Sequence, residues 1–141
     1  MPPGTTKARE LPGKRCFDLW LELKSNTKVA NRLAAEGVVN DKGYPYHYTS
    51  VTNACYRYIM EHMEETRKAL LDYGYDWAAD DSTWLDYVVR KAWTRWMTDP
   101  IRFVEWMDKN SLDIEFYSYI YEAHLAGLRR YIEQFAAKKA R

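Results

Sequence analysis

The amino-acid sequence predicts an all-α protein, and three observations support this fold class. Apolar residues recur every three to four positions through most of the chain, which is the spacing of one helix face. Ser, Thr, Asn and Asp precede several of these stretches, as helix-capping residues do, and Pro and Gly separate them. No internal repeat and no strand-rich region is visible, so the only β-structure that we expect is one small hairpin.

The composition excludes several classes of protein. The 141 residues carry a formal net charge of +1, which suits neither a wholly basic nucleic-acid coat nor an acidic disordered tail. Aromatic residues make up 16% of the chain, too many for a disordered protein. No stretch approaches the roughly 20 apolar residues of a membrane-spanning helix, and the first residues contain no apolar leader. Two cysteines, Cys16 and Cys55, cannot form a disulfide framework or a four-thiolate zinc site. These features predict a soluble intracellular protein with reduced thiols.

Positive charge is concentrated at the two ends of the chain. Residues 1–60 hold 9 basic and 5 acidic side chains, residues 61–125 hold 7 and 14, and residues 126–141 hold 5 and 1. The three segments therefore carry +4, −7 and +4. Two explanations stay open: the ends are simply solvated, or they bring positive charge to phosphate groups while the middle faces something else.

The N-terminal half is expected to begin with a flexible basic arm and two helices. The arm spans residues 1–13 and contains prolines and glycines. Residues 14–24 have helical spacing, and the run 25–27 then breaks the helix and caps a short second one. Gly37 is placed to end that second helix.

A hairpin and a third helix are expected next. Residues 38–46 predict two short extended arms around a turn, in which Gly43 supplies a positive φ. Thr49 or Ser50 caps the third helix, whose inner side is expected to carry Val51, Ala54, Cys55, Tyr58, Ile59 and His62. Whether this helix continues to Leu70 or Leu71, or a new helix begins after residue 62, stays open.

The C-terminal half is expected to be an aromatic-rich helical bundle. A polar linker spans residues 75–81, and Ser82 and Thr83 then open a helix. The dipeptide Asp99-Pro100 is a strong start for another helix, and a last helix is expected from about Leu112 to Lys138. We take residues 82–138 as an oligomerisation or partner-binding region.

Residues 14–62 have the sequence outline of a helix-turn-helix. The small side chains of Ala30, Ala34 and Ala54 allow the second and third helices to pack closely, and the third helix then presents its opposite face to the major groove of DNA. On that face, Asn can read adenine and Arg can read guanine through paired hydrogen bonds, while Ser and Thr contact bases or phosphates. The expected base-reading residues are Ser50, Thr52, Asn53, Tyr56 and Arg57.

Basic residues of the arm, the first two helices and the turn are expected to hold phosphates. The DNA-binding domain would then span residues 14–74, preceded by the arm. The alternative is an ordinary three-helix packing unit whose polar side chains face water. The expected phosphate-binding residues are Arg9, Lys14, Arg15, Lys28, Arg32 and Lys42.

Three runs in this region resemble an extended-turn helix-turn-helix family. They are KVANRLAAEGVV at residues 28–39, KGYPY at residues 42–46 and TSV at residues 49–51. The pattern is similar to that of the recombinase region of large serine recombinases and of many phage DNA-binding proteins. These share an A-x-x-L-x-x-E-G helix, a basic hairpin with Gly and an aromatic residue, and a capped S-x-V recognition helix. The resemblance covers about 25–35 residues, and the chain has no room for a serine nucleophile domain. It therefore implies DNA binding without strand cleavage, in the cytoplasm of a bacterial or phage-infected cell.

The aromatic residues of the C-terminal half have helical spacing, which is typical of a core or a subunit interface. Their neighbours around residues 99–122 are mainly acidic, which favours a protein partner over nucleic acid. We expect either a homo-oligomer or a bound protein partner at this region. The expected interface residues are Trp93, Trp96, Trp106, Tyr117 and Tyr121.

No enzyme class fits the sequence. The three histidines are scattered without metal-ligand spacing, and His62 with Glu65 is more typical of a surface contact. The pair Asp80-Asp81 suits a linker and cap, and no phosphate-binding glycine loop occurs. We expect no catalytic residue, metal, cofactor, small-molecule substrate or membrane partner.

The sequence thus predicts a non-enzymatic protein that binds double-stranded DNA, with a role in phage packaging, regulation or recombination. Its plan is similar to that of a phage small terminase subunit, which joins a DNA-reading helix-turn-helix to oligomerising helices. The alternative is a helical protein–protein adaptor that does not bind DNA. The sequence leaves the DNA site, the oligomeric state and any protein partner open.

Overall fold

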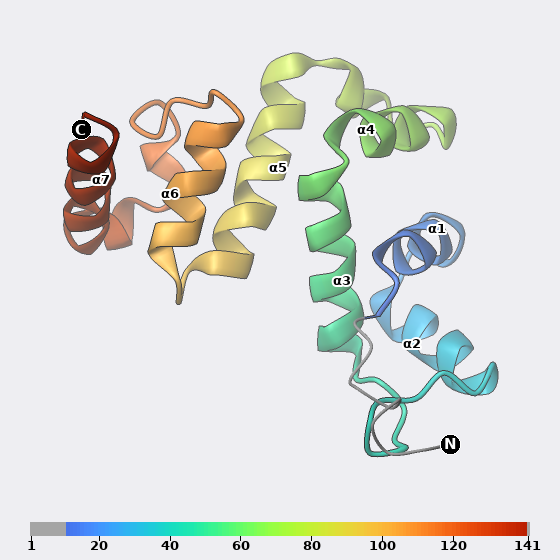
Figure 1. Cartoon of the computed structure of the whole chain (residues 1–141). Helices are drawn as coiled ribbons and strands as arrows, with labels where there is room; N and C mark the ends of the chain where they lie inside the picture. The colour runs from blue at the N-terminus through green and yellow to red at the C-terminus, as the bar shows by residue number, and fades with distance from the viewer. Residues whose placement is uncertain (1–10, 141) are drawn as a thin grey trace. The chain divides into compact units, whose positions relative to one another are not determined.

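A computed structural model of the chain describes residues 11–140, so the expected phosphate contact Arg9 lies outside the described residues. Every helix or strand element in this range is a helix, which confirms the expected all-α class (Figure 1). The only extended structure between residues 11 and 140 is an isolated antiparallel bridge between Val39 and Pro45. No helix in the described range is long and apolar enough to cross a membrane.

The described residues divide into two compact units, between Ala78 and Ala79. Short 3-10 helices supplement the α-helices, among them η2 (Asp76–Ala79) at the division. The first unit contains α1 (Gly13–Leu23), α2 (Asn26–Ala35), α3 (Tyr48–Glu61) and α4 (Met63–Asp72). The second unit contains α5 (Asp81–Trp96), α6 (Pro100–Lys109) and α7 (Leu125–Lys139).

The core of the first unit lies where α1 and α2 pack against α3. Small side chains allow this packing: Ala30 and Ala54 are buried as expected, whereas Ala34 is half-buried. Burial raises the pKa of the Cys16 thiol to about 11 and that of Cys55 to about 12, so both stay protonated and act as small apolar groups. The buried cluster consists of Leu11, Cys16, Leu19, Val29, Ala30, Leu33, Val51, Ala54 and Cys55.

The ends of α2 follow the sequence closely, whereas the start of α3 does not. The Ser25 hydroxyl accepts a hydrogen bond of 3.3 Å from the backbone N–H of Lys28, and Gly37 has a φ of +79°. The expected caps of α3 were Thr49 or Ser50. Instead the cap is His47, two residues before Thr49, and the helix begins at Tyr48: the Nδ1 atom of His47 accepts from the backbone N–H of Thr49 at 3.3 Å.

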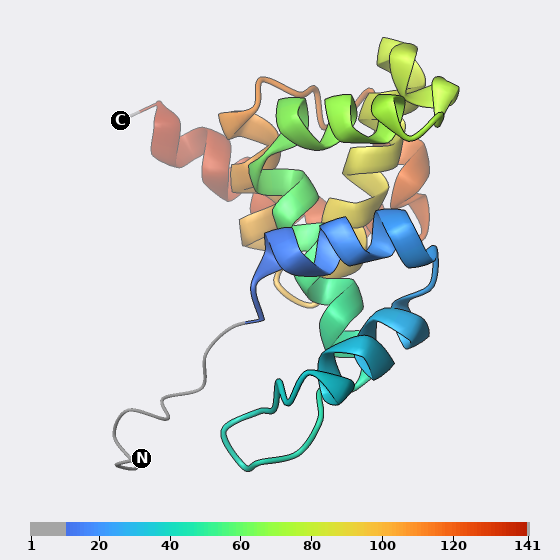
Figure 2. The same ribbon diagram turned by 90° about the vertical axis from the view of Figure 1, so that its right-hand side faces the viewer.

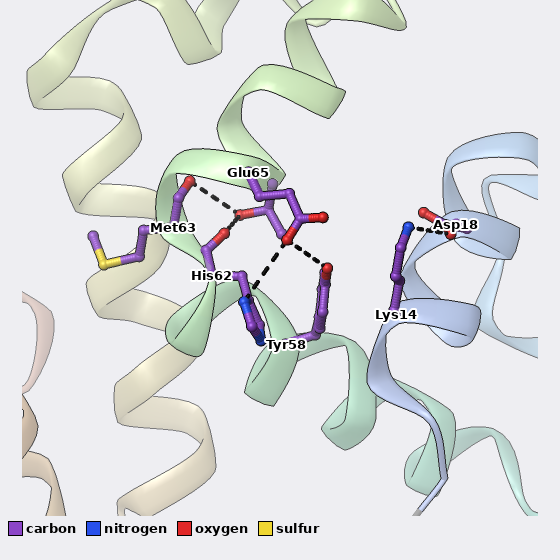
Figure 3. Close-up of polar contacts among 7 residues, drawn as sticks. Lys14, Asp18, Tyr58, His62, Met63 and Glu65 are labelled. Atoms are coloured by element: carbon purple, nitrogen blue, oxygen red, sulfur yellow. Dashed lines mark hydrogen bonds and ion pairs between the residues drawn. The ribbon is translucent and has the colours of Figure 1, made fainter.

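A bend at His62 separates α3 from α4, so a new helix does begin after residue 62 (Figure 3). The expectation that His62 lies on the inner side of α3 is wrong: its side chain is exposed, and its φ and ψ of −134° and 56° break the helix. The buried hydroxyl of Thr66 donates to the His62 carbonyl at 2.8 Å. Across the bend, the Tyr58 hydroxyl of α3 donates to the Glu65 carboxylate of α4 at 2.7 Å. These bonds fix the end of α3.

Aromatic rings form the centre of the second unit. The Trp93 ring lies 5.1 Å from Phe103 and 5.6 Å from Tyr121, measured between centroids. The Asp80 carboxylate caps α5 by accepting from the backbone N–H of Thr83 at 2.8 Å, in agreement with its expected role as a cap. Pro100 occupies the first turn of α6 as expected, but the Asp99 side chain makes no capping bond there.

The last helix is shorter than the sequence predicts. Instead of running from Leu112, α7 begins at Leu125, and two 3-10 helices, η3 (Ser118–Ile120) and η4 (Glu122–His124), precede it. Two features explain the irregular segment. Ser111 adopts a positive φ of 56°, and the Tyr121 hydroxyl donates to the carbonyl of Ile114, which folds the chain back on itself.

Candidate nucleic-acid interface

The candidate interface combines three parts of the first unit: the outer side of α2, the α2–α3 loop (residues 36–47) and the N-terminal half of α3. Figures 1 and 2 show that this loop lies at the N-terminal end of α3, beside the end of α2, while α4 follows the other end of α3. The loop and the N-terminal half of α3 therefore lie at the same end of the first unit.

Hydrogen bonds with Asn40 hold the tip of the α2–α3 loop. The Asn40 Oδ1 atom accepts from the backbone N–H groups of Lys42 and Tyr44, at 2.9 and 3.0 Å. The Asn40 backbone N–H also donates to the Tyr44 carbonyl at 2.8 Å. Gly43 completes the turn with a φ of +84°, as expected, because a side chain is strained in that conformation.

The base of the loop is anchored in the core, whereas its tip is exposed. Val38 and Tyr46 pack against the buried cluster of the first unit. Between them, Lys42 is exposed and the Tyr44 side chain is 66% exposed. The sequence analysis includes Tyr44 in the KGYPY run of the hairpin but assigns it no contact.

The α3 residues expected to read bases differ in how accessible they are. Asn53 is exposed, while Ser50 and Thr52 are half-buried. The Thr52 hydroxyl donates to the Tyr48 carbonyl at 3.0 Å, one helical turn earlier, which leaves its oxygen available as an acceptor. Ser50 and Asn53 are three positions apart and therefore share one side of α3.

Tyr56 and Arg57 are less suited to base contact than the sequence suggests. Tyr56 is half-buried against the core cluster, and burial raises the pKa of its hydroxyl. Arg57 is also half-buried, and its Nη2 atom donates to the backbone carbonyl of Leu11 at 2.7 Å. This bond directs one end of the guanidinium towards the start of α1.

The expected phosphate contacts divide into exposed cations and paired ones. Lys28, Arg32 and Lys42 are exposed and form no ion pair with another residue in the range 11–140. By contrast, Lys14 pairs with Asp18 at 2.9 Å and Arg15 pairs with Glu36 at 2.7 Å, both at the surface. Surface ion pairs contribute little to stability, but each neutralises a charge that the sequence assigned to phosphate.

The expected interface aromatics of the second unit are mainly core residues. Trp93, Trp106, Tyr117 and Tyr121 are buried, and Trp96 is half-buried with its ring 6.4 Å from that of Trp106. The Trp93 ring contacts that of Tyr121, and the Trp96 ring contacts that of Trp106. The four buried side chains therefore contribute to the core of the second unit in this structure.

Two aromatic residues that the sequence analysis did not select are exposed in the second unit. The side chains of Phe116 and Tyr119 are 65% and 51% exposed. The Tyr119 hydroxyl donates to the Asp86 carboxylate at 2.5 Å, and this bond raises the pKa of Tyr119 to about 12. Both residues lie in the irregular segment before α7, where helical spacing cannot indicate which side is buried.

The basic C-terminal end is also partly neutralised. Arg129 contacts Glu115 through two hydrogen bonds, of 2.6 and 3.2 Å, and Lys139 pairs with Asp108 at 2.7 Å. At Arg129 and Lys139, a phosphate would have to displace these carboxylates. We therefore place the candidate interface on the first unit alone.

Residues 11–140 contain no cluster of His, Cys, Asp and Glu side chains that could hold a metal ion. The expected surface contact of His62 with Glu65 is present, at 3.7 Å between Nδ1 and Oε2. No match to the chain was found among protein families, curated proteins or solved structures.

Proposed function

We propose that this chain is a non-enzymatic protein that binds double-stranded DNA through its first unit. The observation that supports this most strongly is the position of three exposed cations. Lys28 and Arg32 are exposed on α2, whose Val29, Ala30 and Leu33 pack against α3, and Lys42 is exposed in the loop that leads into the half of α3 with exposed Asn53. In a helix-turn-helix, the second of the two helices enters the major groove while the first crosses the phosphate backbone.

Each part of the interface has a physical role in this proposal. The three cations neutralise phosphates and fix the register of α3 without sequence information. Asn53 reads a base edge, because its amide group can both accept and donate to adenine. Ser50 and Thr52 offer hydroxyl contacts beside it. Arg57 acts within the protein, since its guanidinium is engaged with Leu11.

We propose that the second unit supplies oligomerisation or partner binding through exposed Phe116 and Tyr119, in place of the buried tryptophans. This plan suits a packaging, regulatory or recombination accessory protein of a bacterial or phage-infected cell. The same two exposed aromatic side chains also favour the second candidate function, a helical adaptor that binds proteins only.

Salt dependence separates the two functions. Fluorescence anisotropy of a labelled random-sequence duplex would be measured with the full chain at two salt concentrations. We expect tight binding at low salt that weakens steeply as salt rises, because bound phosphates release counterions. In the triple variant Lys28→Met, Arg32→Met, Lys42→Met, the slope of log K against log salt should fall by about 2.7, at roughly 0.9 for each lost phosphate contact.

The matched control for the triple variant is a single substitution of another exposed lysine. Lys68 is also exposed but lies on α4, away from the candidate interface, so Lys68→Met should leave the slope unchanged. Absence of duplex binding at low salt would contradict the proposal and favour the adaptor.

A further inference from the structure

Two side chains at the tip of the α2–α3 loop, those of Lys42 and Tyr44, are exposed and are not part of the packing of the first unit. We propose that Lys42 and Tyr44 form a phosphate clamp on duplex DNA, in which the Lys42 ammonium and the Tyr44 hydroxyl bind backbone phosphates beside α3. The inference rests on the proposed function and deepens it, because it assigns a phosphate contact to Tyr44 beside Lys42, which the sequence already places among the phosphate-binding residues.

The exposure of Tyr44 is the first argument. At 66%, it is the most exposed of the large apolar side chains in residues 11–140. Tyr46, two positions later, packs against the core, so the loop does not need Tyr44 as well to be anchored. Tyrosine is a regular hydrogen-bond donor to phosphate, and its neighbour Lys42 supplies the positive charge that attracts the phosphate.

The order of the loop is the second argument. The two backbone N–H groups that Asn40 Oδ1 binds belong to Lys42 and Tyr44 themselves, at 2.9 and 3.0 Å. The bridge between Val39 and Pro45 closes the loop below them. The backbone of both contact residues is therefore held before DNA binds, which lowers the entropy cost of binding. Asn40 is a positioning residue in this arrangement, because it acts through the backbone of the other two.

The location of the loop is the third argument. Its two ends are the C-terminus of α2 and the N-terminus of α3, the helices that are proposed to cross the backbone and enter the groove (Figure 2). Val38 and Tyr46 fix the base of the loop on the core that α2 and α3 share. The tip thus has a set position relative to Asn53, as a contact on the flanking phosphates requires.

The test is duplex binding by four single variants of the full chain: Tyr44→Phe, Tyr44→Ala, Lys42→Met and Asn40→Ala. We expect Tyr44→Phe to weaken binding by about tenfold, and Tyr44→Ala by at least as much, because each loses a hydrogen bond to a charged group. Lys42→Met should also reduce the salt slope by about 0.9, whereas Tyr44→Phe should leave it unchanged. Tyr73, 55% exposed at the end of α4, provides the control variant Tyr73→Phe, which should bind like the parent.

Asn40→Ala distinguishes positioning from contact. Asn40→Ala should weaken duplex binding. The double variant Asn40→Ala, Tyr44→Phe should lose less binding free energy than the sum of the two single losses, because the loosened loop no longer places the Tyr44 hydroxyl. Thermal unfolding of the Tyr44 variants should match that of the parent, since the side chain is exposed. A purely structural role would lower their unfolding temperature instead.

The outcomes separate this inference from the function on which it rests. If the parent chain binds duplex and Tyr44→Phe binds equally well, the clamp is wrong while the proposed function stands. If the parent chain does not bind duplex at low salt, the proposed function fails and the clamp fails with it.

Discussion

The Nη2 atom of Arg57 donates a hydrogen bond of 2.7 Å to the backbone carbonyl of Leu11, which joins the middle of α3 to the segment before α1. Leu11 is itself buried in the core of the first unit. Gly13 lies close by, where an added Cβ atom would be 3.0 Å from the Cβ atom of Tyr58 and 3.1 Å from the Ala54 carbonyl oxygen. This start of α1 is therefore tightly fixed against α3, and Arg57 is part of that attachment.

Arg57→Met is expected to destabilise the protein and to leave its choice of DNA sequence unchanged. A buried carbonyl would lose a charged donor, at a cost of about 1–3 kcal/mol in the free energy of unfolding. Urea denaturation measures that cost, and selection from a random duplex library measures the sequence preference. Unchanged stability combined with relaxed preference at a guanine position would show instead that Arg57 reads a base.

Gly13→Ala is expected to destabilise the first unit because the new Cβ atom would meet atoms that cannot move easily. Crowding of this kind costs about 1–3 kcal/mol. Gly127 in α7 is a matched control, since nothing lies within 4 Å of an added Cβ atom there. Gly127→Ala should stabilise the helix by about 0.5–1 kcal/mol. Thermal unfolding of both variants checks the prediction, and an equal effect of the two would contradict it.

The hydroxyl of Tyr58 should make stability depend on pH in the alkaline range. Burial first, and then its hydrogen bond to Glu65, raise the pKa of Tyr58 to about 12, from an ordinary value of 10 (Figure 3). The unfolded chain therefore loses the proton more readily than the folded protein. The resulting stabilisation is fully present below pH 10 and is lost as the pH rises towards 12.

Tyr58→Phe isolates this contribution from that of the other tyrosines. The free energy of unfolding would be measured by urea denaturation at several pH values between 9 and 12. The variant should lose less stability over that range than the parent, because it lacks the proton that Tyr58 releases. Parallel curves for the two proteins would rule out a stabilising role for the neutral Tyr58 hydroxyl.

Trp93→Ala is expected to act on folding more than on association. Trp93 is buried against Phe103 and Tyr121, so its truncation should cost about 3–5 kcal/mol in the free energy of unfolding. Phe116→Ala, which removes an exposed ring, should change the unfolding temperature little. Sedimentation and thermal unfolding would be compared for the two. If Trp93→Ala were as stable as the parent but had a different oligomeric state, this prediction would be wrong, and Trp93 would be an interface residue as its spacing in the sequence indicates.

Local signals in the sequence predicted much of the first unit. Ser25, Gly37 and Gly43 act through their own side chains or their own φ values, so their effects are visible in a short stretch of residues. The all-α class follows from helical spacing in the same way. For the candidate site, that spacing predicted the surface position of Asn53, Lys28 and Arg32, and the expected turn did the same for Lys42.

Contacts between distant residues could not be predicted in this way. The bond of Arg57 to Leu11 spans 46 positions, and no local pattern distinguishes an exposed arginine from one that holds a neighbouring segment. The bend at His62 depends on Thr66 and on the Tyr58–Glu65 bond across it. Likewise, the spacing of the tryptophans is compatible with a core or an interface, and only their burial identifies the core.

The most direct test of the central claim, that α3 reads DNA, is selection from a random duplex library with the parent chain and with Asn53→Ala. Asn31, exposed on α2, supplies the control variant Asn31→Ala. We predict that the parent and the control enrich the same site and that Asn53→Ala loses preference at an A·T position, at a cost of about 1–3 kcal/mol. Enrichment of the same site by Asn53→Ala with undiminished preference would contradict the assignment of α3 as the recognition helix.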